Sequence, residues 1–235
     1  MTPDRATARA LAREYNARHD PVGWFEALYA RAAGSDDGAR LIPWADLAPN
    51  PHLVSWLDAH PRAHGGRRAL EVGCGLGDDA EELARRGYAV TAFDVSPTAV
   101  QWCRRRFPHS PVAYLCYDLL VDPPTEWEGA FDLVVEAYTL QVLPQGVRPV
   151  AMARMARCVT PGGVLLLICR GREPHDPEGL MPWPLMRAEL DAFADLGLDA
   201  LEFEDYVDQE DPPVRRFRAA YRRPLPAGVS KTRGG

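Results

Sequence analysis

Three glycines and two acids between residues 71 and 94 could bind a ligand. Gly73, Gly75 and Gly77 follow Glu71 in the segment ALEVGCGLG at 69–77, and Asp94 closes a second apolar run. Glycines let the backbone turn sharply and approach a ligand closely. A strand, a glycine turn, a helix start and a second strand ending in a carboxylate form half of a nucleotide-binding α/β unit.

The glycine spacing differs from that of a dinucleotide-binding loop. The G-x-G-x-x-G fingerprint needs glycine at position 78, where this chain has Asp78, and the sequence contains no G-x-x-x-x-G-K segment. A carboxylate at the start of a helix would repel a pyrophosphate. The loop is therefore expected to admit a nucleoside without phosphates, such as S-adenosylmethionine. An NAD-dependent oxidoreductase is disfavoured, also because no catalytic pair is recognisable.

The two acids end apolar strands, where open α/β sheets bind their ligands. A carboxylate can accept hydrogen bonds from both hydroxyls of a ribose, so Asp94 is the expected ribose-binding residue. Glu71 is expected beside the methionine end of the ligand, where an ammonium and a sulfonium carry positive charge.

Residues 40–223 resemble the class I S-adenosylmethionine-dependent methyltransferases. The resemblance is carried, in order, by Glu71 with the glycine loop, Asp94, the pair Asp118 and Leu119, FDLVVE at 131–136 and TPGGVLLL at 160–167. It implies S-adenosyl-L-methionine as cofactor. The cofactor-binding residues expected on this basis are Tyr29, Trp44, Glu71, Gly73, Cys74, Gly75, Gly77, Asp94, Val95, Asp118, Leu119 and Glu136.

The expected fold is α/β and Rossmann-like: a doubly wound, mostly parallel seven-stranded sheet with one antiparallel strand, plus an N-terminal helical cap. Strands are predicted at 68–72, 88–93, 112–116, 131–136, 163–169, 199–207 and 215–222, and helices at 4–18, 24–33, 51–60, 78–86, 97–107, 146–158 and 184–196. The short turn at Pro212 and Pro213 makes the last two strands a hairpin. The predicted organisation is a cap or lid at 1–60, a core at 61–223 and a disordered tail at 224–235.

The segments before the core resemble the thiopurine and thiol S-methyltransferase branch and the tellurite-resistance-type enzymes. They are GWFEALY at 23–29, IPW at 42–44 and NPHL at 50–53, together with AYTLQVLP at 137–144. The resemblance implies that Trp24, Tyr29 and Trp44 close over the cofactor and the acceptor, whereas the helical spacing of Trp24 and Tyr29 is equally typical of a core. An arginine often follows the strand-four acid in that branch; here Ala137 takes its place, so its role cannot be carried over.

The acceptor is expected to be a small molecule, most simply a thiol, because a thiol ionises near neutral pH and needs no dedicated base. The candidate catalytic residues are Tyr138 and Glu136, with His19 and His175 as weaker candidates, and Arg170 and Trp183 could line the acceptor side. The alternatives are O- or N-methylation of a small metabolite, or a regulator that binds the cofactor without transferring methyl.

Composition limits the remaining classes. A net charge of −6 disfavours a nucleic-acid partner, and the arginines at 104–106, 215–218 and 222–223 are expected at a helix end or on solvent-exposed faces. The five cysteines lack metal-ligand spacing, so no metal is expected and a reducing cytoplasm is the expected location. No apolar run near 18 residues indicates a membrane span. The oligomeric state is left open.

Overall fold

A twisted β-sheet with helices on both faces forms the centre of the computed structural model, which describes residues 5–34, 38–61 and 67–226. The strands are β1 (Arg68–Val72), β2 (Ala89–Asp94), β3 (Ala113–Cys116), β4 (Phe131–Ala137), β5 (Val159–Arg172), β6 (Leu185–Met186), β7 (Asp199–Val207) and β8 (Arg215–Arg222). The order is β3-β2-β1-β4-β5-β8-β7, with β6 paired to β5. Only β8 runs against its neighbours β5 and β7, as predicted. The Rossmann-like fold class is confirmed.

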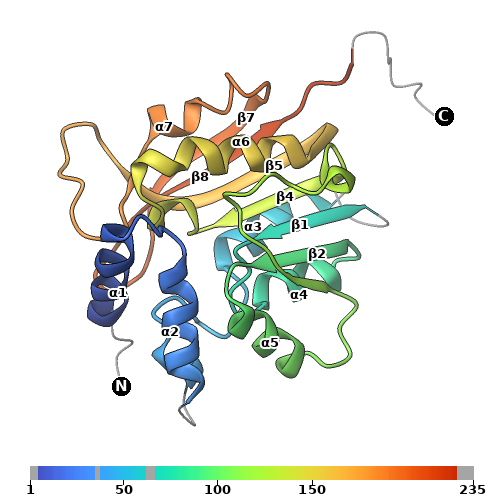
Figure 1. The fold of residues 1–235 in the computed structure, drawn as a ribbon. Helices are drawn as coiled ribbons and strands as arrows, with labels where there is room; N and C mark the ends of the chain where they lie inside the picture. The colour runs from blue at the N-terminus through green and yellow to red at the C-terminus, as the bar shows by residue number, and fades with distance from the viewer. Residues whose placement is uncertain (1–4, 35–37, 62–66, 227–235) are drawn as a thin grey trace.

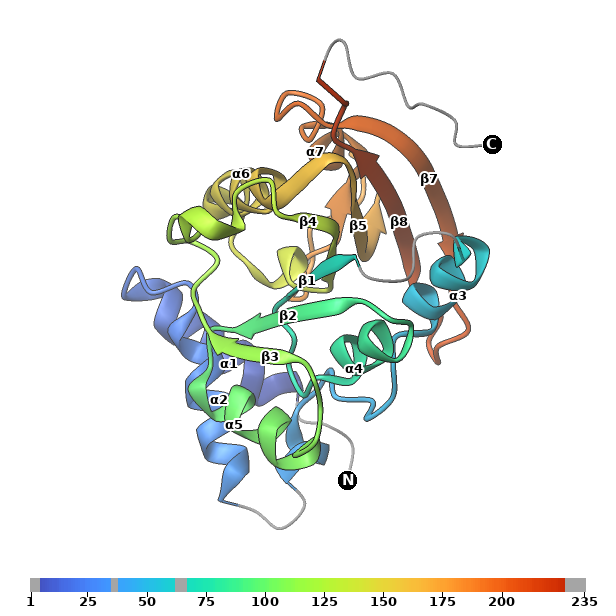
Figure 2. The ribbon, with the colours of Figure 1, turned by 90° about the vertical axis from the view of Figure 1, so that its right-hand side faces the viewer.

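Seven α-helices surround this sheet in the described part of the chain: α1 (Arg5–Ala17), α2 (Gly23–Ala33), α3 (Pro51–Ala59), α4 (Asp78–Arg85), α5 (Pro97–Arg106), α6 (Arg148–Cys158) and α7 (Arg187–Asp191). Helices α6 and α7 cover one face of the sheet, and α3, α4 and α5 pack on the other (Figure 2). Helices α1 and α2 lie side by side beyond the sheet (Figure 1). They form a separate cluster with the segment near Trp44.

The parallel register brings the carboxyl ends of four strands together. Val72 pairs with Phe93 and with Glu136, and Asp94 pairs with Cys116. Both faces of the central strands are covered, which explains why β1 and β4 read as nearly continuous apolar runs. The loops that follow these strands therefore meet at one edge of the sheet.

Two predicted elements are wrong in detail. The helix expected at 184–196 is reduced to α7, because β6 pairs with Gly171 and Arg172 and draws residues 185–186 into the sheet. The backbone N–H of Met186 donates to Glu189 Oε2 at 2.8 Å and caps the helix. Helix α7 therefore begins only after the residues of β6. Strand β5 is longer than the predicted 163–169, and its pairing with β4 shifts register between Phe131 and Leu133. Residues 227–235 of the predicted tail lie outside the described part of the chain.

The predicted solvent-exposed face of β8 is also wrong. Arg216 is only 2% exposed, and its guanidinium lies over the Tyr138 ring at 4.6 Å from the ring centroid. Strand β8 is an inner strand whose two edges pair with β5 and β7, and its faces are covered by other parts of the fold, with Tyr138 over Arg216. Arg216 is compensated there by Asp208 at 2.7 Å and by Glu210.

Candidate functional site

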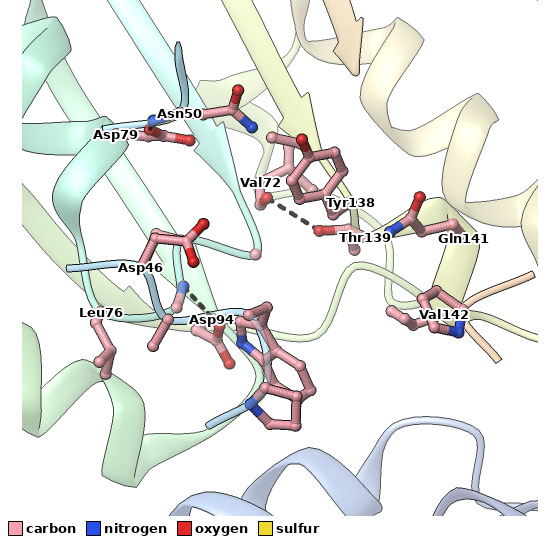
Figure 3. A pocket seen from close by; sticks show the side chains of 18 of the residues that line it. Asp46, Asn50, Val72, Leu76, Asp79, Asp94, Tyr138, Thr139, Gln141 and Val142 are labelled. Carbon is pink, nitrogen blue, oxygen red and sulfur yellow. Dashed lines mark hydrogen bonds between the residues drawn. The ribbon is translucent and has the colours of Figure 1, made fainter. Parts of the chain in front are cut away.

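A cavity of about 800 Å³ opens at the carboxyl edge of the sheet. Its walls come from the loops after β1 to β4, from the end of β5, from residues 206–210 before β8, and from the cap segments before the core. Figure 3 shows Asp94 and Asp46 on one side of this space and the segment from Tyr138 to Val142 on another. The cavity lies where an open α/β sheet binds its ligand.

The glycine loop lines the cavity, and two of its positions favour glycine because of their positive φ, with a close contact in addition at Gly73. Gly73 has φ +66°, and a Cβ there would lie 2.4 Å from Thr139 Oγ1. Gly75 has φ +54°, and its Cβ would approach the Tyr29 hydroxyl to 3.3 Å. Cys74 also lines the cavity, while its backbone N–H donates to Phe93 O at 2.9 Å. The loop therefore offers bare backbone to a ligand.

The third glycine serves packing instead. Gly77 is not among the residues that line the cavity. Its φ is +89°, and a Cβ would lie 2.7 Å from Tyr114 Oη and 3.1 Å from Cys103 Sγ. Gly77 thus lets α4 start close to β3 and α5, outside the cavity lining.

Asp94 joins the glycine loop to the next loop. Its carboxylate accepts hydrogen bonds from Gly75 N at 3.0 Å and from Ser96 N at 2.9 Å, one on each oxygen. Burial raises the pKa of Asp94 to about 6, against the lowering effect of these bonds. Asp94 and Val95 both line the cavity, and the free lone pairs of the carboxylate are available to hydroxyl donors.

Glu71 is a buried carboxylate without a matching donor. It lines the cavity at 2% exposure, and its Oε2 has no hydrogen-bond partner in the described part of the chain. Burial raises the pKa of Glu71 well above its usual value, with Asp79 and Glu136 adding repulsion. Asp79, whose pKa burial raises to about 6, accepts from Asn50 N at 2.6 Å. A ligand with an ammonium group would relieve this uncompensated negative charge.

Asp78 lines the same cavity but is already neutralised. Its two oxygens accept from the Arg106 guanidinium at 2.7 and 2.8 Å. The repulsion of a pyrophosphate expected from Asp78 is therefore weakened by an ion pair. Glu71 and Asp79 supply the uncompensated negative charge near this helix start instead.

The residues expected around a purine base lie in the loop that follows β3. Asp118 and Leu119 both line the cavity. Asp118 is half-buried and accepts from Leu120 N at 2.8 Å, which holds the loop after β3. Phe93 and Tyr117 add aromatic surface to the same wall.

Two aromatic side chains of the cap lie over the glycine loop. Trp44 Nε1 donates to the Tyr29 hydroxyl at 2.9 Å, and both residues line the cavity. Burial raises the pKa of Tyr29, so it stays a neutral hydroxyl. Trp24 is fully buried and is not part of the lining, so of its two interpretations the core role is correct.

Glu136 lies behind the cavity wall and is not among its lining residues. It is fully buried, and its Oε1 accepts from Thr139 N at 2.5 Å and Leu140 N at 2.9 Å. Burial raises the pKa of Glu136 to about 7. This position does not support the expected contact of Glu136 with cofactor or acceptor. It holds the turn that presents Tyr138, whose φ is +69°.

Tyr138 and several basic residues form the opposite part of the cavity. The Tyr138 ring covers Arg216, and its hydroxyl hydrogen-bonds the Asn50 side chain. Arg170 lines this part as predicted. Trp183 does not, although its neighbours Met181 and Pro182 do.

His52 was missed by the sequence interpretation. It lines the cavity next to Tyr206, with ring centroids 5.1 Å apart. Burial and then the charge of Arg216 lower the pKa of His52, so its ring is neutral at physiological pH. The segment NPHL carried the signal, because Asn50 caps α3 and places His52 in the first turn. His19 and His175, named earlier, do not line the cavity.

Within the ranges 5–34, 38–61 and 67–226, no group of three or more His, Cys, Asp or Glu side chains is placed to hold a metal ion. None of the helices in those ranges is long and apolar enough to cross a membrane.

Comparison with known proteins gives a consistent family. Residues 69–163 match the family described as "Methyltransferase domain". The chain is 25% identical over 169 residues to the 2-heptyl-1-hydroxyquinolin-4(1H)-one methyltransferase of Mycobacteroides abscessus, covering 71% of this chain and 72% of that protein. It is 31% identical over 164 residues to probable thiol methyltransferase 2 of Arabidopsis thaliana, covering 69% and 67%. It is 30% identical over 161 residues to the ubiquinone biosynthesis O-methyltransferase of Pseudomonas aeruginosa, covering 68% and 66%.

Solved structures share the fold. The N-methyltransferase NodS from Bradyrhizobium japonicum, in complex with S-adenosyl-L-homocysteine, superposes with a TM-score of 0.66 at 23% identity, covering 85% of this chain and 98% of that one. A structure titled for conversion of a disulfide bond into a thioacetal group during echinomycin biosynthesis gives 0.67 at 23% identity, covering 87% and 92%. At this identity these two structures establish the architecture, and the acceptor must be argued from the cavity.

Proposed function

The chain belongs to the class I S-adenosylmethionine-dependent methyltransferases, and we propose that it methylates a small molecule whose accepting atom is the sulfur of a thiol. The observation that carries the proposal is the difference, among the described residues, between two parts of one cavity: an acidic part with the unpaired carboxylate oxygen of Glu71, and a basic part with the unpaired guanidinium of Arg170. The relatives include both thiol and O-methyltransferases, so they do not distinguish the accepting atom. The choice of sulfur is therefore argued from the residues of the cavity.

The acidic part fits the cofactor. S-adenosylmethionine supplies, when bound, a methyl group on a positively charged sulfonium. We propose that Asp94 binds the ribose, that Asp118 and Leu119 flank the adenine, and that Glu71 faces the methionine ammonium. Glu71 fits this role because its buried Oε2 lacks a donor in the described structure. Tyr29 and Trp44 would exclude water from above the glycine loop.

The basic part fits an acceptor that is already acidic. His52 has a lowered pKa and is therefore a weak base, well matched to a thiol but poorly matched to an alcohol. The carboxylates Asp208 and Glu210 at this end are paired with Arg216, so they are not free to take a proton. The positive charge of Arg170 would favour an acceptor that carries negative charge, as a thiolate does, and the thiolate is the reactive form of a thiol.

A second candidate is O-methylation of a phenol-like hydroxyl, with His52 as the general base. The observation that favours it is the neutral His52 ring in the cavity wall. The similarity to a hydroxyquinolone methyltransferase and a ubiquinone biosynthesis O-methyltransferase supports the same alternative.

The test offers thiophenol, phenol and aniline with S-adenosylmethionine, and measures S-adenosylhomocysteine and methylated product by mass spectrometry. We expect methylated thiophenol, with a rate at subsaturating acceptor that rises with pH up to the pKa of the thiol. In His52→Gln that pH profile should persist, whereas phenol methylation should fall about 100-fold if His52 is its base. Methylated phenol without methylated thiol would replace the first candidate by the second. Binding of the cofactor without product from any acceptor would favour a non-catalytic regulator.

A further inference from the structure

Arg170 lines the cavity and is partly buried. Its guanidinium has neither an acidic partner nor a hydrogen bond, and among the described residues no other partly buried cation of the cavity lining lacks both. It lies near the carboxyl end of β5. Its backbone N–H donates to Gln141 Oε1 at 2.7 Å, which ties this strand end to the segment after β4. The position of Arg170 is thus fixed, while the buried Nε of its side chain is unsatisfied.

Five acids near this end of the sheet are already paired with other arginines. Asp208 and Glu210 bind Arg216, Asp205 and Glu173 bind Arg215, and Glu204 binds Arg218. None of these carboxylates forms an ion pair with Arg170. Burial, together with the nearby charges of Arg216 and Arg5, lowers the pKa of Arg170, and the more weakly acting Glu210 and Asp208 only partly oppose this.

A half-buried guanidinium without an anion is unfavourable, because it has lost hydration and gained no partner. Its planar fork of donors matches the two oxygens of a carboxylate. We infer that Arg170 binds a carboxylate group of the methyl acceptor, separate from the accepting atom. That the carboxylate belongs to a methyl acceptor rests on the proposed function, whereas binding of a carboxylate at Arg170 can be measured without turnover.

The cofactor has a carboxylate of its own, and the sheet order argues against it as the partner. Asp94 ends β2 and Glu71 lies on β1, whereas Arg170 lies on β5, with β4 between β1 and β5 (Figure 1). Neighbouring strands are about 4.8 Å apart, so β5 lies about 10 Å from the strand that carries Glu71. A cofactor held over β2 and β1 leaves the space over β4 and β5 to the acceptor.

The experiment compares acid and amide probes of equal shape: 4-mercaptobenzoate with 4-mercaptobenzamide, and benzoate with benzamide. Calorimetry measures their binding to the full chain saturated with S-adenosylhomocysteine, and product formation is measured separately with S-adenosylmethionine and the two thiols. The variants are Arg170→Gln and the charge-conserving Arg170→Lys. Arg105→Gln removes the same charge at an exposed position and is the matched control.

In the wild type and in Arg105→Gln, we expect the acids to bind about 10- to 100-fold more tightly than the amides, the range for a charge-assisted pair. Arg170→Gln should remove this preference and leave amide binding within about twofold. Arg170→Lys should keep part of it, because the charge remains while the fork is lost. Equal binding of acids and amides to the wild type, or no binding of either acid, would overturn the inference.

Two further outcomes separate the inference from the proposed function. If Arg170→Gln weakens S-adenosylhomocysteine itself about tenfold and leaves the preference for acids intact, the carboxylate belongs to the cofactor and the inference is wrong. If the acids bind through Arg170 but neither thiol is methylated, thiol methylation fails and the carboxylate site stands. Methylation of both thiols with equal kcat/KM would support the proposed function and contradict the inference.

Discussion

Replacing Asp94 by asparagine should weaken cofactor binding by a predictable amount. Each carboxylate oxygen of Asp94 accepts one backbone N–H, from Gly75 or Ser96, and keeps lone pairs for a ligand hydroxyl. Asparagine keeps one acceptor oxygen and replaces the other by an amide donor, so one backbone N–H and one hydroxyl lose their acceptor. The loss of one charge-assisted hydrogen bond to the ligand is worth about 1.5–3 kcal/mol, or about 10- to 150-fold in Kd.

The assay is calorimetric titration of S-adenosylhomocysteine at pH 7.5, with thermal unfolding of the free protein measured in parallel. The matched control is Asp132→Asn, because Asp132 on β4 also accepts a backbone N–H, from Arg68 at 2.9 Å, but does not line the cavity. Asp132→Asn should leave Kd within about twofold. An unchanged Kd in Asp94→Asn, or an equal loss in Asp132→Asn, would refute the ribose assignment.

The same assignment predicts a pH dependence. The pKa of Asp94 in the free protein is raised by burial to about 6. The carboxylate that accepts hydrogen bonds is therefore present above pH 6 and is lost as pH falls through that value. The affinity for S-adenosylhomocysteine should fall by up to tenfold per pH unit below about 6. In Asp94→Asn this part of the pH dependence should be absent, and an identical pH profile in both proteins would contradict the role of Asp94.

Trp44→Ala should open the cap and raise the acceptor KM by about tenfold with kcat within about threefold, and a fall in kcat alone would contradict a closing role. Gly77→Ala should destabilise the free protein by about 1–3 kcal/mol in chemical unfolding, because its Cβ would clash with Tyr114 and Cys103; an unchanged midpoint would refute this packing argument. In Glu136→Gln turnover should remain within about tenfold, since the carboxylate lies outside the cavity, and a far larger loss would make Glu136 catalytic. The raised pKa of Glu136, about 7, means that the wild type loses stability as pH rises from about 4.5 to 7, and this loss should be smaller in Glu136→Gln. Methyl transfer should be unaffected by EDTA, and its loss with recovery on adding Mg²⁺ would contradict the absence of a metal requirement.

Most residues expected to bind the cofactor line the cavity, and they could be named from sequence because their determinants are local. The glycine loop, Glu71 and Asp94 lie within two adjacent strands and the turns that follow them. Their spacing alone places them at one edge of a parallel sheet. The same reasoning placed Gly77 in the ligand site, although its neighbours Tyr114 and Cys103 come from other elements and show a packing role.

The acceptor side could not be predicted in the same way, because its residues meet only through tertiary packing. Arg216 follows the alternation of a strand and was expected to face solvent, yet β8 is an inner strand and the side chain is buried under Tyr138. His52 reaches the cavity because the bond from Asn50 N to Asp79 draws the start of α3 to the glycine loop. Neither contact leaves a periodic signal in the chain.

Among the described residues, the two parts of the cavity have unpaired groups of opposite charge, so each part favours a ligand of the opposite charge. Before a ligand binds, Asp79 repels Glu71 in a buried space, and burial raises the pKa of Glu71, Asp79 and Asp94. At the other end of the cavity, burial disfavours the positive charge of Arg170 and lowers its pKa. A cationic cofactor offsets the charge of the acids, and an anionic acceptor offsets that of Arg170. Proton exchange on binding should therefore differ between the two ligands: the cofactor releases protons from the acids near pH 6, whereas an acid probe bound at Arg170, which is already charged at that pH, leaves the proton count unchanged. Calorimetry in two buffers of different ionisation enthalpy measures both numbers, and proton uptake on binding an acid probe would place that probe among the acids instead of at Arg170, because an added negative charge raises their pKa further.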